Sequence, residues 1–343
     1  MDEKDLRSLV IRRIVLTVLC VVLGVVLTVM IGATVYAKHL LDRLNYVSPD
    51  PTVPTVQEIA AMETQTQPPL QGFTEPKIEI ADQDFGTGPQ IPVGGGEIVN
   101  ILLIGQDRSG DTGARSDCMI LCTFNKEENT ITMTSFLRDL YVTIPGYRKN
   151  RINAAYTFGG MELLDETLQE NFGVEIDGNV QVDFSHFKEI IDLLGGVNLE
   201  LTAAEAKFIK RYYPNSAVTE GMNRLSGAEA LMYARNRHDV DGDFSRTGRQ
   251  RKLLNALIDA YRNQKLTQML AVLSDVLPMI TTDIPKSDLT AYAVTLFPML
   301  ADAEIITQAI PAAGAYRNAT IDKMAVLVPD LEKNRQLLEE TLK

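Results

Sequence analysis

Six cationic side chains fall within one short segment of this chain: Arg235, Arg237, Arg246, Arg249, Arg251 and Lys252. The chain as a whole is acidic, with a formal net charge of -12. Arginine presents a planar fork of donors that matches phosphate oxygens, and its guanidinium keeps its proton. The segment therefore predicts a site that binds several phosphate oxygens at once. The alternative is a solvated basic face of a helix.

The spacing within this segment predicts which of the side chains point inward. Arg246, Arg249 and Gln250 share one helical face with Leu253, because three or four positions separate them. A helix that carries arginines beside its apolar stripe directs them toward a cleft rather than toward bulk water. Arg251 is expected to fall off this face.

Carboxylates gather in a second segment, residues 105–117, which follows one predicted strand and precedes another. We expect a loop at the C-terminal end of a strand, where ligands usually bind in open α/β sheets. A phosphate-binding P-loop is excluded, because Asp111 stands where that motif requires lysine. Carboxylates suit Mg²⁺, which takes one or two of them together with substrate phosphate. A polar turn with solvated acids is the alternative.

Two weaker patterns accompany these segments. Arg138 and Asp139 lie between two predicted strands and fit either a place in the site or a solvated surface pair. Asp239, Asp241 and Asp243 imitate the start of an EF-hand, but the later glycine and glutamate of that motif are absent. A calcium loop is therefore excluded.

The elements that must position these groups alternate along the chain. Short apolar runs predict buried strands, and apolar residues three or four positions apart predict helices. Strands are expected at residues 99–104, 119–125, 131–136, 141–144, 197–201 and 324–328. Helices are expected at residues 184–194, from the arginine segment through residue 261, and after Asp330. This alternation predicts a layered α/β domain.

The N-terminal part of the chain predicts a membrane anchor and a linker. Residues 14–37 are uncharged and long enough to cross a bilayer, which takes roughly 20 apolar residues. The cations before this run predict a cytoplasmic N-terminus. More than half of the 15 prolines lie between residues 47 and 96, as is typical of a linker. We expect a cytoplasmic tail (1–13), a transmembrane signal anchor (14–37), an extracytoplasmic linker (38–97) and a catalytic domain (98–343) of a single-pass cell-membrane protein.

The cysteine and histidine content argues against other chemistries. Cys118 and Cys122 lie about 13 Å apart along a predicted strand, which is too far for a disulfide, so they are expected to be small buried side chains. The chain has only 3 histidines. Thiol catalysis and a histidine zinc site are therefore not expected.

Taken together, these segments resemble the LytR–CpsA–Psr family of bacterial cell-envelope proteins. The resemblance is close over residues 99–257 and looser to the C-terminus. Its most specific pieces are Asn-Ile-Leu-Leu-Ile-Gly-Gln-Asp at 100–107, Ala-Arg-Ser-Asp at 114–117, Arg-Asp at 138–139, Arg-Ile-Asn-Ala-Ala-Tyr at 151–156, Leu-Ser-Gly-Ala-Glu-Ala-Leu at 225–231, Tyr-Ala-Arg-Asn-Arg at 233–237 and Gly-Asp-Phe-Ser-Arg at 242–246. Gln106, Leu137, Cys118 and Arg151 depart from the residues usual in the family, but none of these departures removes a charged group.

The resemblance implies a layered α-β-α domain with a central mixed sheet, the fold of that family. It also implies a phosphotransferase outside the membrane. Family members move a glycopolymer (wall teichoic acid, capsule or another secondary wall polymer) from a polyprenyl-pyrophosphate lipid carrier to peptidoglycan. They also keep an apolar pocket for the lipid tail, which the sequence does not place.

Roles carry over to this chain by motif position. Asp107 and Asp117 are expected to hold Mg²⁺, or Mn²⁺ in its place. The expected catalytic residues are Asp107, Arg138, Arg237 and Arg246. The expected contacts to the pyrophosphate are Arg115, Arg138, Arg151, Arg235, Arg237, Arg246, Arg249 and Gln250.

Three other functions remain to be weighed against this one. A hydrolase of polyprenyl pyrophosphates would use the same residues, with water in place of the acceptor sugar. A non-catalytic protein that binds the lipid or the wall polymer would need the arginines but not the metal. A transcription regulator is disfavoured, because an exported acidic domain has no access to nucleic acid and has the wrong charge for it.

Overall fold

The structure of this protein is a computed structural model that describes residues 38–47, 97–107, 115–236, 243–262, 272, 274–296 and 298–342. The predicted membrane span at residues 14–37 lies outside these ranges, as do most residues of the predicted linker. Within them, no helix is both long enough and apolar enough to cross a membrane.

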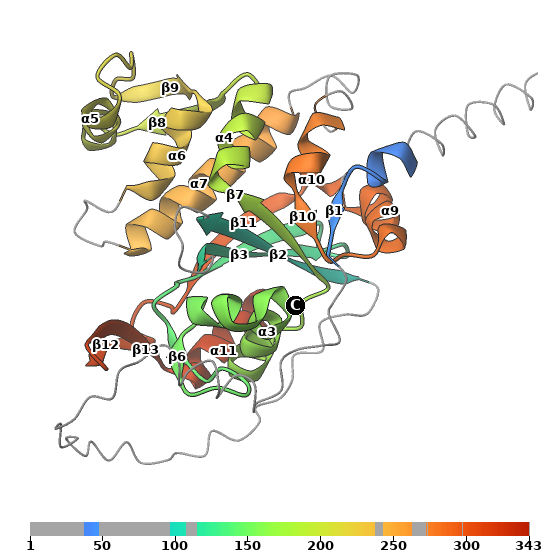
Figure 1. The fold of residues 1–343 in the computed structure, drawn as a ribbon, viewed down its shortest axis with the longest axis vertical. Helices are drawn as coiled ribbons and strands as arrows, with labels where there is room; N and C mark the ends of the chain where they lie inside the picture. Colours follow the sequence, from blue (N-terminus) through green and yellow to red (C-terminus); the bar gives the residue numbers. More distant parts are fainter. Residues whose placement is uncertain are drawn as a thin grey trace, which may run out of the picture.

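A mixed sheet of seven strands forms the centre of the domain (Figure 1). In spatial order the strands are β1 (Asn45–Tyr46), β10 (Thr281–Thr282), β7 (Gly178–Asp183), β2 (Ile98–Asp107), β3 (Arg115–Asn125), β4 (Thr130–Phe136) and β11 (Glu304–Ile310). The pairs β2–β3 and β3–β4 are antiparallel, whereas β7 and β11 run parallel to the strands β2 and β4 that they border. The expectation of a central mixed sheet is confirmed.

Helices cover both faces of this sheet. On one face lie α3 (Asn153–Phe172) and α11 (Leu331–Thr341); on the other lie α4 (Phe184–Leu193), α6 (Gly227–Arg235), α7 (Asp243–Arg262), α9 (Lys286–Thr295) and α10 (Met299–Asp302). Strand β3 shows why two cores form. Met119 and Leu121 belong to the core beneath α3, whereas Ile120 and Cys122 belong to the core on the α10 side. Successive side chains of a strand point to opposite faces, so both faces of this apolar strand must be covered.

A third core lies between α7 and a lobe built from α4, α6, α5 (Ala203–Tyr212) and the hairpin of β8 (Val197–Leu201) and β9 (Gly221–Leu225). Strand β8 alternates buried and exposed residues, so its apolar side faces the lobe. Thr202 begins α5 and Ser226 begins α6, each through a capping box. The remaining elements are the hairpins β5 (Tyr141–Val142) with β6 (Asn150–Arg151) and β12 (Tyr316–Ile321) with β13 (Met324–Pro329), and the short 3-10 helix at Leu277–Met279.

The structure departs from the predicted boundaries at three places. Antiparallel pairing of β2 with β3 continues past Gly105 through a register shift, so Asp117 lies in a strand rather than in the predicted loop. Strand β5 ends at Val142 instead of residue 144. The predicted linker begins with residues that belong to the domain, because β1 adds to the sheet beside β10.

A buried polar cluster joins α3 to the sheet below the site. Asn179 is fully buried, and its Nδ2 donates 2.7 Å hydrogen bonds to Oδ2 of Asp165 and to Oδ2 of Asp283. Burial raises the pKa of Asp165 from its ordinary 3.8 to about 8. The folded protein therefore holds a proton on Asp165 that the unfolded chain releases at lower pH.

The proton on Asp165 makes stability depend on pH. Between roughly pH 4 and pH 8 the folded state binds more protons than the unfolded state, so stability is lost as the pH rises through that window. We expect Asp165→Asn to raise the melting temperature at pH 8.5 and to change it little at pH 4.5. Thermal melts at both pH values test this, with the exposed Asp302→Asn as the control. A variant that melts with the pH dependence of the wild type would contradict it.

Candidate functional site

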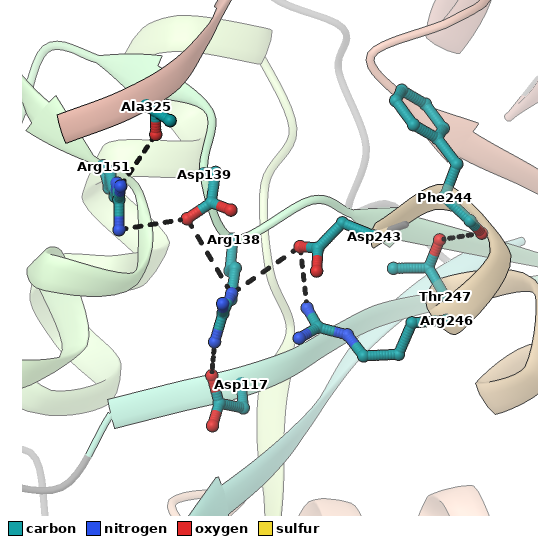
Figure 2. Close-up of polar contacts among 9 residues, drawn as sticks. All are labelled: Asp117, Arg138, Asp139, Arg151, Asp243, Phe244, Arg246, Thr247 and Ala325. Carbon is teal, nitrogen blue, oxygen red and sulfur yellow. Dashed lines mark hydrogen bonds and ion pairs between the residues drawn. The ribbon is translucent and has the colours of Figure 1, made fainter. Parts of the chain in front are cut away.

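Arg138, immediately after β4, is the centre of an ion-pair network (Figure 2). Its Nη1 donates a 2.6 Å hydrogen bond to Oδ1 of Asp117 on β3. Its Nε lies 3.6 Å from Oδ2 of Asp243 on α7 and 3.8 Å from Oδ1 of Asp139. Burial lowers the pKa of Arg138, but the hydrogen bond to Asp117 and the neighbouring carboxylates outweigh burial, so the pKa rises above its ordinary value. The tertiary structure thus joins the three segments that the sequence singled out.

Arg246 reaches the same network from the first turns of α7. Its Nη2 donates a 2.9 Å hydrogen bond to Oδ2 of Asp243, the oxygen that also faces Arg138 (Figure 2). Only 2% of Arg246 is exposed, as the helical-face prediction required. One shared carboxylate therefore holds two arginines together.

A polar pocket of about 270 Å³ opens beside this network. It is lined by Asp117, Phe184, Arg235, Arg246 and Gln250. The exposed guanidinium of Arg235 lies 5.1 Å from the centre of the Phe184 ring, within cation–π range. Two arginines, an amide and one carboxylate thus converge on a space that suits several anionic oxygens.

Two predicted phosphate contacts lie away from this pocket. Arg151 places Nη1 3.3 Å from Oδ1 of Asp139 and donates from Nη2 to the carbonyl oxygen of Ala325 (Figure 2). Arg249 faces inward as expected, but its guanidinium is engaged by the protein. Its Nε donates to Oε1 of Glu205 at 2.8 Å and its Nη1 donates to the carbonyl oxygen of Asn236.

The pair of Arg249 and Glu205 holds the lobe to α7. Arg249 is 7% exposed and Glu205 8%, so water screens their interaction little. Hydrogen bonds to Thr202 and Arg249 outweigh the effect of burial and lower the pKa of Glu205. The stability from this pair is therefore present above pH 4.5 and is lost as the pH falls through the lowered pKa.

We expect Glu205→Gln to destabilise the fold by about 3 kcal/mol, because it leaves the buried charge of Arg249 without its counter-charge. Glutamine keeps the capping box of α5, so the loss reports the ion pair. Urea unfolding at pH 7 measures it, with the exposed Lys207→Ala as the control. Pairing Glu205→Gln with Arg249→Met should recover part of the loss. No recovery in the double variant would mean that the loss does not come from the uncompensated charge of Arg249.

Arg251 lies off the face that carries Arg246 and Gln250 into the pocket, but it is partly buried rather than exposed. Its charge acts on Cys118 of β3. The reason is that α7 packs on the lobe with one side and across β3, β4 and β11 with another. A helix enclosed on two sides has a second inward face.

Three of the predicted residues stay untested by this geometry. Asp107 ends β2 and Arg115 begins β3, and the two residues pair across the ladder. Their side chains lie outside the described part of the chain, and so does the whole of Arg237.

The prediction of small buried cysteines is confirmed for Cys122, whereas Cys118 is only partly buried. Cys118 and Cys122 are both free, and Cys122 is buried in the core on the α10 side. Burial raises the pKa of both thiols to about 12, so neither is a thiolate at neutral pH.

An apolar cavity, which the sequence did not place, adjoins the polar pocket. Its volume is about 280 Å³, and it shares Phe184, Arg235 and Gln250 with the polar pocket. Its apolar walls come from β2, β3, β7, α4, α6 and α7 and include Leu103, Ile120, Val180, Val182, Phe187, Ile190, Leu231, Leu253, Leu254 and Leu257. The sequence signal for this cavity was the apolar stripe on α4 and on α7. Each stripe is wide enough to contact both a core and the cavity.

The polar pocket supplies part of the coordination that a divalent cation needs, and the oxygens of a bound anion would supply the rest. Among the described residues, no group of three or more histidine, cysteine or acidic side chains is arranged to hold a metal. Asp117 lines the pocket, and its Oδ1 accepts the hydrogen bond from Arg138. Mg²⁺ takes one or two protein carboxylates together with waters and phosphate oxygens, so this donor set fits it when an anion is present.

Fold and site together define an α/β domain with an arginine-lined polar pocket beside an apolar cavity. The chain matches the model of the LytR_cpsA_psr family over residues 78–342. It is 30% identical over 249 residues to the regulatory protein MsrR of Staphylococcus aureus strain COL, which covers 71% of this chain and 74% of MsrR. The chain belongs to the LytR–CpsA–Psr family.

Two further relatives carry names or ligands that describe a reaction. The polyisoprenyl-teichoic acid–peptidoglycan teichoic acid transferase TagU of Bacillus cereus is 36% identical over 179 residues, which are 52% of this chain and 57% of TagU. A solved structure of TagT bound to LIIa-WTA superposes with a TM-score of 0.60 at 25% identity. The match covers 76% of this chain and 92% of the TagT chain.

Proposed function

We propose that this protein is a phosphotransferase that moves a glycopolymer from a polyprenyl-pyrophosphate carrier to peptidoglycan. One observation carries the proposal: the polar pocket lined by Asp117, Arg235, Arg246 and Gln250 adjoins an apolar cavity, with which it shares three lining residues. A diphosphate joined to a long hydrocarbon chain presents that combination of charge and apolar surface. The names of TagU and the ligand of TagT support the same substrate class.

The transfer step balances as the exchange of a phosphoanhydride bond for a phosphate ester bond. A hydroxyl of the acceptor sugar attacks the phosphorus that carries the polymer, and the bond from that phosphorus to the bridging oxygen breaks. The polymer leaves with its phosphate on the acceptor, and polyprenyl phosphate remains. The hydroxyl proton passes to a base, for which we propose Asp107. Catalysis of such a step is mainly positioning and stabilisation of negative charge.

The described residues divide this work between them. Arg235, at the end of α6, and Arg246, near the start of α7, offer donors to the phosphate oxygens. Arg138 fixes the carboxylate of Asp117 through its 2.6 Å hydrogen bond. We propose that Asp117, together with Asp107, holds Mg²⁺ or Mn²⁺, which would offset the charge of the pyrophosphate.

We further propose that residues 14–37 anchor the protein in the cell membrane and that the domain lies outside. A carrier lipid resides in the membrane, so an enzyme that acts on it benefits from being tethered there. Protease treatment of spheroplasts should remove the domain. Full protection of the domain would refute this orientation.

The decisive experiment separates transfer from hydrolysis. The full-length chain would be incubated with a polyprenyl-pyrophosphate-linked polymer and Mg²⁺, with and without peptidoglycan. Polymer on peptidoglycan is the expected product. Release of free polymer phosphate at the same rate in both samples would identify a hydrolase, and binding without turnover would identify a non-catalytic protein. MsrR is named a regulatory protein, but the net charge of -12 does not suit a DNA-binding domain.

A further inference from the structure

Arg251 carries a charge that nothing in the described protein balances. Its Nε and Nη1 are enclosed and have no hydrogen-bond partner, and it forms no ion pair with any described residue. Arginines nearby that are partly or fully buried have a carboxylate beside them instead. Arg138 has Asp117 and Arg249 has Glu205.

An unbalanced buried charge is costly to a folded protein. Taking an ion out of water costs several kcal/mol unless partners replace the lost hydration. Arginine cannot avoid that cost by losing its proton. Burial does lower the pKa of Arg251, the direction expected of a cation with no carboxylate beside it. A residue held at such a cost needs a compensating benefit.

Arg251 lies near the polar pocket, so its charge can act on a ligand bound there. Arg251 follows Gln250, which lines the polar pocket, and its charge acts on Cys118, which follows Asp117. The charge of Arg246 acts on the same cysteine. Arg251 does not line either the polar pocket or the apolar cavity. It therefore adds positive potential behind the pocket wall without offering a donor to a ligand.

We propose that Arg251 is a positioning residue of the pyrophosphate site, which strengthens binding of the diphosphate through its unbalanced charge rather than through contact. The proposal rests on the proposed function, since it needs a diphosphate in the polar pocket. The effect of Arg251→Lys is therefore expected to be mild. A lysine keeps the charge, and the fork geometry of arginine is not used at this position.

Binding of octaprenyl pyrophosphate to the full-length chain in detergent tests the proposal. Arg251→Met keeps the apolar stem and removes the charge. We expect its dissociation constant to rise about tenfold, whereas Arg251→Lys should stay within about threefold of the wild type. The affinity of Arg251→Met should also fall less steeply as salt is added. Uncharged octaprenol, which probes the apolar cavity alone, should bind all three proteins equally.

The melting temperatures of the ligand-free proteins distinguish this role from a structural one, because loss of a structural residue would lower the melting temperature. We expect Arg251→Met to melt at the same temperature as the wild type or higher, because the unbalanced charge is gone. Lys252→Met is the matched control: this exposed neighbour donates from Nζ to the carbonyl oxygen of Glu200 and should bind the pyrophosphate normally.

Several results would overturn the inference. They are unchanged affinity of Arg251→Met, equal loss in Arg251→Lys, or a lower melting temperature of the ligand-free Arg251→Met. Wild-type protein that fails to bind octaprenyl pyrophosphate would instead refute the proposed function.

Discussion

Arg246→Lys is expected to lose nearly all transfer activity, by about 100- to 1,000-fold. Arg246 is 2% exposed, lines the polar pocket and is oriented by Oδ2 of Asp243. A guanidinium held in this way can offer its remaining donors to the diphosphate as a fork, whereas lysine offers a single point charge. Losing one pre-positioned donor of this kind typically costs about 2.7–4 kcal/mol of transition-state stabilisation.

The neighbours of Arg246 on α7 provide the comparison. Lys252→Ala and Arg251→Lys should remain near the wild-type rate, the first because Lys252 is exposed and the second because the charge is kept. Initial rates on one lipid-linked substrate, at saturating and limiting concentrations, measure all three variants. Equal losses across the three would mean that the segment is a diffuse basic patch and that no shaped phosphate site exists.

Asp117→Asn is the second change with a large expected effect. The amide keeps the shape of the carboxylate and can still accept the hydrogen bond from Arg138 Nη1, so the fold should persist. It loses the charge that holds the proposed metal and that balances Arg138. We expect turnover to fall about 100-fold or more, with a higher Mg²⁺ concentration needed for half-maximal rate.

The metal role has its own controls. Asp107→Ala should show the same loss of Mg²⁺-dependent turnover, whereas the exposed Asp302→Asn should not. Chelator should abolish the activity of the wild type, and Mn²⁺ should restore it as Mg²⁺ does. Full activity in chelator, or wild-type rates in both aspartate variants, would exclude the metal from the reaction.

Local patterns in the sequence determined much of this protein. The spacing of Arg246, Arg249, Gln250 and Leu253 follows the helical period. The structure buries three of these side chains and leaves Gln250 partly exposed at the pocket. The strands expected at β2, β3 and β4 are confirmed, and β2 and β3 are apolar on both faces because helices cover both faces of the sheet. These features depend on neighbours within a few residues, which the sequence displays directly.

The tertiary structure decided what the inward side chains meet. Arg249 shares its face with Arg246, yet it is held by Glu205, 44 positions away, whereas Arg246 lines a pocket. The apolar cavity between the sheet and the helices and the unbalanced charge of Arg251 likewise arise only when α7 packs against both the lobe and β3. The physical reason is that helical period fixes the direction of a side chain, whereas the partner it meets there comes from a distant segment brought in by packing.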